Sequence, residues 1–394
     1  MRLPRLLLTL SATATLASCA FPDKPPSNQT PESELVYDER DAIPNDVPLP
    51  KPGVNQRPVV GVKKVLVSVV HWSNGDSLKY DLIQKHTFSD DPGSFQNYIK
   101  AASSGKLILD GRVIVHTSGL RPDICKSGSP MPIALATSEG DKAARANGLN
   151  PADFDYQINI IDCRGGGSAY RPGRIMGIYG QAGSSHVYNH EFGHNLGYAH
   201  GKTYTRCPSA GDRIDAPTRC TTINYGDTGD SVSGGRTLYP ANNRWYSGWL
   251  DASQAVAISR SGYYRLGVLG ANGSADPQLY LINRSDTPSQ LALEYRKPTP
   301  FDNFPPSDNR INGVWMRYTS MAGSVNNTQL DATPETASTA DPALAANGRY
   351  IFDSAAGVIV RVCKTTPTYA EIAVGVNSEL APSCIRPTMQ PDQE

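Results

Sequence analysis

The sequence predicts a mixed α/β (α+β) part with a twisted mixed sheet, followed by an all-β, sandwich-like part. Two observations carry this prediction. Up to about residue 250, short apolar runs alternate with longer amphipathic segments, which is typical of strands and helices that pack together. Beyond Trp249, β-branched and aromatic runs alternate with turns rich in Pro, Gly, Asn and Asp. This change places a domain boundary near residue 255.

The first domain is expected over residues 56–255. Lys63–Trp72 is an apolar, β-branched run, typical of a buried strand. The segment 91–115 predicts a helix, a break at a Ser-Gly pair, and two strands, Leu107–Leu109 and Arg112–Val115. The remaining expected elements are a helix in 131–148, a strand at Tyr156–Asp162, and a short strand with glycines in 173–181.

The second domain is expected over residues 256–386, with a tail at 387–394. Its predicted strands are short runs between turn residues, which is the pattern of a β-sandwich. They lie at 263–269, 278–283, 291–296, 313–319 and 357–363.

The N-terminus is typical of an export signal. Arg2 and Arg5 precede an apolar run, Leu6–Ala17, that is too short to anchor as a membrane helix. "LASC" then resembles a bacterial lipobox, which implies a signal peptide at 1–18 and lipidation of Cys19; an ordinary signal peptide cut nearby is the alternative. The implied location is the bacterial cell envelope, at the outer membrane or cell surface, with membrane contact only through the lipid. Residues 19–55 are rich in Pro and polar residues and predict an extended tether.

Six cysteines remain after Cys19, and six cysteines allow fifteen pairings. An exported protein meets an oxidising compartment, so disulfides are favoured over free buried thiols. Proximity along the chain suggests three pairs: Cys125 with Cys163, Cys207 with Cys220, and Cys363 with Cys384.

The chain has a formal net charge of zero and a pI near 7. It lacks the basic stripe that nucleic-acid binding requires. No nucleic-acid partner is therefore expected.

The stretch "HEFGHNLGYAH", residues 190–200, carries most of the functional information. A chain of this composition would match H-E-x-x-H-x-x-G-x-x-H by chance about once in 10⁵ sequences. His190 and His194 are four residues apart, so on a helix they share one face and are able to bind one ion. Gly197 suits the helix end, where a positive φ is needed, and lets the chain return His200 as a third ligand.

Three histidines with one open position describe a catalytic zinc site, because structural zinc sites usually close with cysteine. The predicted cofactor is therefore Zn²⁺. Glu191 is placed beside the ion as the general base that takes a proton from bound water. The implied reaction is hydrolysis of peptide bonds in a protein, peptide or glycoprotein substrate. The alternative for these residues is a helix whose histidines are satisfied in the core.

The extended motif resembles that of the metzincin zinc metalloproteases. Other segments are similar to the gametolysin-type branch: residues 94–111, 223–234, 244–251, 293–296 and 331–353. The resemblance covers most of residues 60–375 and implies a metzincin-like catalytic domain with a zinc helix. It also implies that His190, His194 and His200 bind zinc and that Glu191 is the base.

The sequence departs from this family at the turn beneath the metal. The family places a methionine there, and here the comparable position is Val232. The tyrosine that some members use after this turn has no counterpart, because Ser233 and Gly234 follow. The leading interpretation is a secreted, lipid-anchored zinc endopeptidase. The alternatives are a surface-anchored binding protein that retains zinc with little catalysis, and a zinc hydrolase acting on glycoproteins or cell-wall peptides.

Overall fold

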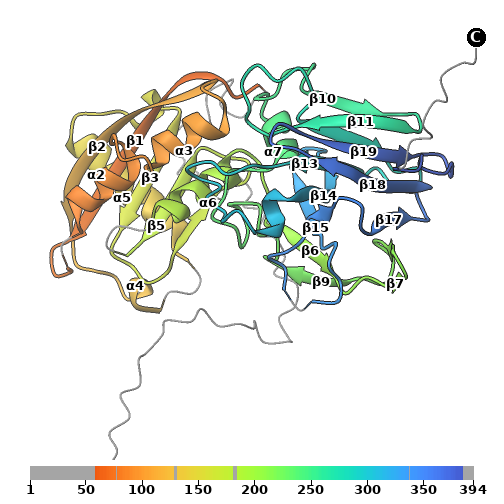
Figure 1. The fold of residues 1–394 in the computed structure, drawn as a ribbon. Coiled ribbons are helices and arrows are strands. Elements are labelled where there is room, and N and C mark those ends of the chain that lie inside the picture. The colour runs from red at the N-terminus through yellow and green to blue at the C-terminus, as the bar shows by residue number, and fades with distance from the viewer. Residues whose placement is uncertain (1–57, 77, 128–130, 181–183, 337, 385–394) are drawn as a thin grey trace, which may run out of the picture. The chain divides into compact units, whose positions relative to one another are not determined.

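The computed structural model describes residues 58–76, 78–127, 131–180, 184–336 and 338–384. The predicted signal peptide (1–18), the lipidation site Cys19, the tether (19–55) and the tail (387–394) lie outside these described residues. The described helices are α2 (Tyr80–Thr87), α3 (Phe95–Ala102), α4 (Ile124–Ser127), α5 (Ile133–Ala146), α6 (Ser185–Asn195) and α7 (Ala241–Tyr246), with short 3-10 turns at Pro151–Asp153 and Asn309–Ile311 (Figure 1).

The first sheet has the strand order β2-β1-β3-β5-β4. All neighbouring pairs in it are parallel except β4 with β5, which is antiparallel. The mixed sheet expected for this part of the chain is therefore present. Its strands are β1 (Gly61–Trp72), β2 (Leu107–Ser118), β3 (Tyr156–Ile161), β4 (Gly167–Ala169) and β5 (Ile175–Tyr179).

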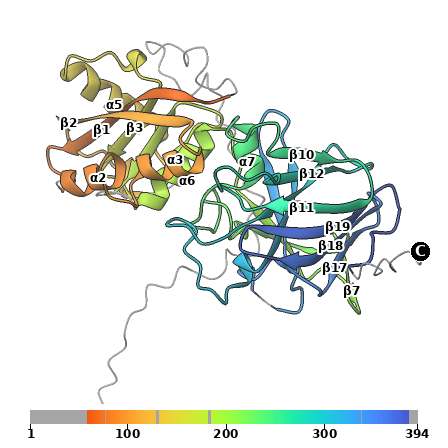
Figure 2. The same cartoon turned by 45° about the horizontal axis from the view of Figure 1, so that its top comes forward.

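The apolar run of β1 is buried because helices cover both faces of this sheet. Successive side chains of a strand point to opposite faces. Val65, Val67 and Val69 accordingly join one hydrophobic cluster, and Leu66 and Val70 join another. Figure 2 shows α5 on one side of the strands and α3 and α6 on the other.

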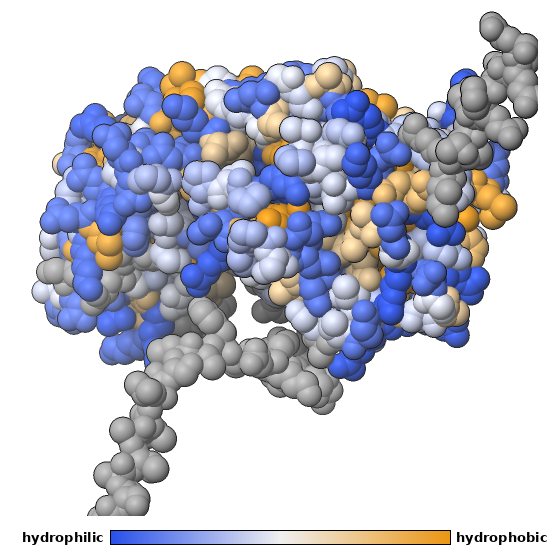
Figure 3. All heavy atoms as spheres, in the orientation of Figure 1, coloured by the Kyte–Doolittle hydropathy of each residue, from blue (hydrophilic) through white to orange (hydrophobic). Residues whose placement is uncertain are grey.

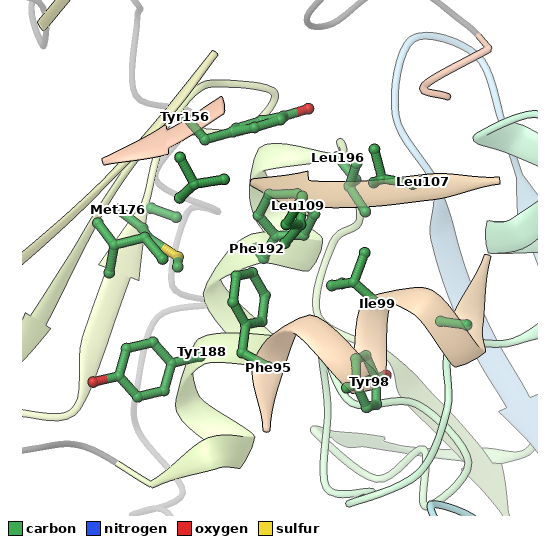
Figure 4. Packing of buried hydrophobic residues seen from close by; sticks show 14 of the residues in the cluster. Phe95, Tyr98, Ile99, Leu107, Leu109, Tyr156, Met176, Tyr188, Phe192 and Leu196 are labelled. Atoms are coloured by element: carbon green, nitrogen blue, oxygen red, sulfur yellow. The ribbon is translucent and has the colours of Figure 1, made fainter. Parts of the chain in front are cut away.

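Aromatic side chains hold α6 against α3 and the sheet. The ring of Phe192 on α6 meets Phe95 of α3 edge-on, with centroids 5.2 Å apart, and Tyr156 of β3 at 4.8 Å (Figure 4). Such pairs contribute about 0.5–1.5 kcal/mol each beyond the burial of their area. The helix that carries His190 and His194 is thus fixed on its apolar side.

The two strands predicted at 107–109 and 112–115 form the single strand β2. Gly111 lies inside that strand. A Cβ added at Gly111 would lie 2.3 Å from the ring of Phe88, so the glycine marks a close approach and not a turn. Helices α2 and α4 lie in segments where the sequence predicts no element.

Two further sheets follow. One has the order β10-β12-β13-β14-β15-β6-β9 with β16 beside β14, and the other has the order β11-β19-β18-β17-β8-β7. The strands of the former are β6 (Lys202–Thr205), β9 (Thr221–Asn224), β10 (Ala255–Ile258), β12 (Leu279–Asn283), β13 (Gln290–Tyr295), β14 (Gly313–Ser320), β15 (Asn326–Leu330) and β16 (Leu344–Ala345). Those of the latter are β7 (Ser209–Ala210), β8 (Arg213–Asp215), β11 (Gly262–Gly267), β17 (Tyr350–Asp353), β18 (Val358–Thr365) and β19 (Tyr369–Gly375).

These two sheets share one hydrophobic cluster and cross the predicted domain boundary. Leu293 and Met316 from one sheet pack in the same cluster as Val360 and Ile372 from the other. Strand β6 pairs with β15, and β8 pairs with β17, so strands from residues 202–215 complete sheets built mainly from residues beyond 255. An independent domain at 256–386 stays a prediction.

The described part of the chain has no helix long and apolar enough to cross a membrane. The face drawn in Figure 3 is largely hydrophilic, with small separate apolar groups.

Candidate metal centre

Helix α6 presents two histidines of the motif on one face. His190 and His194 are one helical turn apart, and their ring centroids are separated by 4.9 Å. The opposite side of the helix carries Tyr188 and Phe192, which are buried in the core. The apolar residues thus orient the helix, and the two histidines lie on its other side.

The chain leaves the helix at Gly197, as the spacing predicts. Gly197 has a φ of 96°, a value that non-glycine residues rarely adopt. The next residues are held in place by backbone hydrogen bonds between Gly197 and Val325 and between Ala199 and Val325. The segment that ends at His200 is therefore held by the loop before β15.

The three histidine rings converge through their Nε2 atoms. His200 Nε2 lies 3.0 Å from His194 Nε2 and 3.2 Å from His190 Nε2. The other ring nitrogens are occupied: His190 Nδ1 lies 2.9 Å from the Ser231 carbonyl oxygen, and His194 Nδ1 lies 2.7 Å from that of Tyr198. A carbonyl accepts only from N–H, so both Nε2 atoms keep their lone pairs for an ion. The group of His190, His194 and His200 could hold a metal ion.

Burial keeps these imidazoles neutral, which is the form that binds metals. Desolvation, together with the neighbouring histidine, lowers the pKa of His194 to about 3 and the pKa of His200 to about 3. Desolvation also holds the pKa of His190 well below its ordinary value. Protons therefore compete weakly for the three nitrogens at neutral pH.

Glu191 follows His190 on α6 and is also buried. Its Oε2 atom has no hydrogen-bond partner, and a Cβ added at Gly167 of β4 would lie 2.6 Å from its Oε1 atom. Desolvation raises the pKa of Glu191 to about 8. A cation held by the histidines would oppose that shift and favour the charged carboxylate. A buried carboxylate oxygen without a partner indicates a place for a ligand.

The turn that contains Val232 lies against α6. Val232 is fully buried, and its Cγ2 atom is 2.3 Å from where a Cβ would stand on Gly193. The preceding carbonyl, of Ser231, is the acceptor for His190. The turn therefore lies against α6 and orients His190, while its equivalence to the family's methionine turn stays a prediction.

A buried ionic network, which the sequence analysis missed, holds this turn. Arg317 on β14 bonds Asp227 through two nitrogens, at 2.6 and 3.0 Å, and reaches Glu294 on β13 at 2.7 Å. Arg296 bonds Glu294 at 2.8 Å and donates to the carbonyl of Gly229 at 2.8 Å. The signal was present: Glu294 and Arg317 are charged residues inside otherwise apolar strands, and Arg296 directly follows β13.

All three predicted cysteine pairs are at bonding distance. They are Cys125 with Cys163, Cys207 with Cys220, and Cys363 with Cys384. The second pair joins the ends of β6 and β9 that lie away from the histidines, because Thr205 pairs with Thr221 just inside it. This disulfide thus closes the hairpin that begins just after His200.

A second residue that the sequence analysis did not select lies beside the cluster. The hydroxyl of Tyr225 is 3.1 Å from His200 Nε2.

No family model matches this chain, and no curated protein is significantly similar to it. The geometry of the centre is therefore the main evidence on function.

Proposed function

We propose that the protein is a zinc-dependent endopeptidase. The observation that carries the proposal is the convergence of three Nε2 atoms, together with the buried, unpartnered carboxylate oxygen of Glu191, the residue that follows His190 on α6. A purely structural metal site has no use for such a carboxylate. Its presence favours hydrolysis over the alternative of a binding protein that retains a metal.

The donor set fits zinc. Three neutral imidazoles with no nearby thiolate are typical of catalytic zinc sites, with Zn–N distances of about 2.0–2.1 Å. Tetrahedral ligands at that distance lie about 3.3 Å from one another, close to the separations of 3.0 and 3.2 Å between the Nε2 atoms. When bound, zinc would supply a water of lowered pKa and would polarise a carbonyl.

Glu191 would move the protons. As general base it takes one proton from the attacking water, whose oxygen bonds to the carbonyl carbon of the peptide. The C–N bond then breaks, and Glu191 gives the proton to the leaving amine. Atoms balance, with one water consumed and one carboxylate and one amine formed. The buried position of Glu191 keeps bulk water from competing for that proton.

Strand β4 supports an extended peptide as the substrate. It is the terminal strand of its sheet, and Gly167 on it lies against Glu191. Edge strands bind extended peptides by adding them as a further strand. A peptide that pairs with β4 would pass the carboxylate with chain on both sides of the scissile bond, which favours an endopeptidase. Lipid attachment at Cys19, and hence a location at the cell envelope, is part of the proposal and rests on sequence alone.

The Glu191→Gln variant tests the proposal. It should keep one metal ion per chain, measured by metal analysis, because the three histidines are unchanged. Its cleavage of a broad peptide library, followed by mass spectrometry, should fall by about 10²–10⁴-fold because the general base is lost. Glu335→Gln is a matched control, since Glu335 is an exposed partner of Arg349. Near-normal cleavage by Glu191→Gln, or wild-type cleavage that a chelator leaves unchanged, would contradict the proposal.

A further inference from the structure

Tyr225 points its hydroxyl at the metal centre. Its ring lies against His200, with centroids 4.2 Å apart and planes inclined by 37°, and its hydroxyl is 3.1 Å from His200 Nε2. The side chain is 43 % exposed, so it does not serve mainly as core packing. It therefore lies on the open side of the histidine cluster.

The backbone holds Tyr225 in an unfavourable conformation. Its φ is 57°, in the left-handed region that a bulky residue rarely adopts. The chain beyond the turn packs against it, because a Cβ on Gly234 would lie 2.6 Å from the Tyr225 carbonyl oxygen. Such outliers cluster at functional sites, where the surrounding structure enforces them.

The β6–β9 hairpin sets the distance between Tyr225 and His200. Lys202 on β6 pairs with Asn224 on β9 at one end of this antiparallel ladder. His200 comes shortly before Lys202 and Tyr225 comes directly after Asn224, so both residues lie just beyond that end of the ladder. The Cys207–Cys220 disulfide closes the other end of the hairpin. The hydroxyl is thus positioned by regular pairing and a covalent link.

We propose that Tyr225 is a catalytic residue that donates a hydrogen bond to the carbonyl oxygen of the scissile peptide. This rests on the proposed function. His190 and His194 have no N–H left to donate, because each Nδ1 already serves a carbonyl and each Nε2 would be a ligand of the bound ion. Glu191 acts as the base. The hydroxyl of Tyr225, 3.1 Å from His200 Nε2, supplies a neutral donor beside the site where negative charge would develop on oxygen.

Tyr225 keeps its proton throughout. It stabilises the charge on the oxygen while water adds to the carbon, and it releases the hydrogen bond when the C–N bond breaks. No net proton passes through it, so the balance of hydrolysis is unchanged. A donor of this kind strengthens its bond mainly in the transition state, and its loss lowers kcat more than it raises KM.

The test compares Tyr225→Phe with Tyr204→Phe, a control on the same hairpin whose ring packs on Tyr318. Three quantities are measured: zinc content, kcat and KM on the best library peptide, and the affinity of the Co²⁺-loaded protein for acetohydroxamate by visible absorption. Tyr225→Phe should keep its zinc, lose about 10²-fold in kcat with KM little changed, and bind acetohydroxamate at least about tenfold more weakly. Tyr204→Phe should match the wild type in all three.

The acetohydroxamate measurement does not depend on peptide cleavage. If the wild type cleaves no peptide but Tyr225→Phe still binds the probe more weakly, the proposed function fails, and Tyr225 stands as a hydrogen-bond donor to an oxygen bound at the metal but not as a catalytic residue for peptide hydrolysis. Unchanged affinity for the probe in Tyr225→Phe would overturn the donor role, whatever the peptide results. Loss of zinc in Tyr225→Phe would also overturn it, because the hydroxyl would then be a metal ligand or a structural group.

Discussion

Gly193 lies between the two helical histidines, and its missing side chain makes room for Val232. In an exposed helix, alanine would be more stabilising than glycine by about 1 kcal/mol. Here the added Cβ would lie 2.3 Å from Val232 Cγ2, and Tyr239 lies 3.1 Å away on the same side. The tight fit makes glycine more favourable than alanine at this position, because Val232 is stiff about its first side-chain torsion and is fully buried.

Gly193→Ala should therefore destabilise the protein, by about 1–3 kcal/mol in the free energy of unfolding, as expected for overpacking. Urea unfolding followed by circular dichroism measures this. The double variant Gly193→Ala with Val232→Ala removes the overlapping methyl group and should recover part of the loss. A single variant as stable as the wild type would show that the turn does not press on α6 at this point.

Among the elements, the β6–β9 hairpin has a disulfide at one end and lies beside the candidate metal centre at its other end. Its disulfide, Cys207–Cys220, closes a loop with a sequence separation of 13. Closing a loop of this length stabilises a protein by about 3 kcal/mol in the chain-entropy model. The same link restrains the two strands of the hairpin, and His200 lies just beyond their other end.

Replacing Cys207 and Cys220 together with serine should lower the free energy of unfolding by up to about 3 kcal/mol and weaken metal binding. Urea unfolding and competition against a chelator measure the two effects. The matched control replaces Cys363 and Cys384, a pair with a separation of 21 at the end of β18. That control should lose stability but keep the metal affinity of the wild type. Equal metal affinities in both double variants would show that the hairpin link does not orient His200.

Across the whole described chain, the ionic network joins the metal centre to the strands of the C-terminal part. Burial by itself would raise the pKa of Glu294, but Arg296, Arg317 and the backbone amide of Ala241 outweigh it and lower the pKa to about 2. The ordinary pKa of a glutamate is 4.5. The unfolded chain therefore binds a proton at a higher pH than the folded chain does.

The contribution of Glu294 to stability should be complete above about pH 4.5 and should be lost as the pH falls towards 2. Urea unfolding of the wild type and of Glu294→Gln at about pH 6 and pH 3 isolates this effect as a difference. The gap in unfolding free energy between the two proteins should narrow at the lower pH. A gap that stays constant or widens at acid pH would mean that Glu294 is not held charged by the arginines.

The sequence alone determined the three histidines that could hold a metal ion, the helix that carries two of them, the buried strand β1, the main C-terminal strands and the cysteine pairs. These follow from interactions over short stretches: helical period, continuous apolar runs, glycine at a helix end, and closure of short loops. They depend little on where distant segments lie.

Only the tertiary structure decided the ionic network, the position of Tyr225 and the order of the strands in the sheets. Arg317 and Asp227 are 90 residues apart, and no periodicity relates them. Tyr225 reaches His200 because an antiparallel ladder brings two chain segments together, and β6 and β8 complete sheets built mainly from the C-terminal part. The order of strands in a sheet and the neighbours of a buried charge depend on how all segments pack at once, and local patterns do not encode that arrangement.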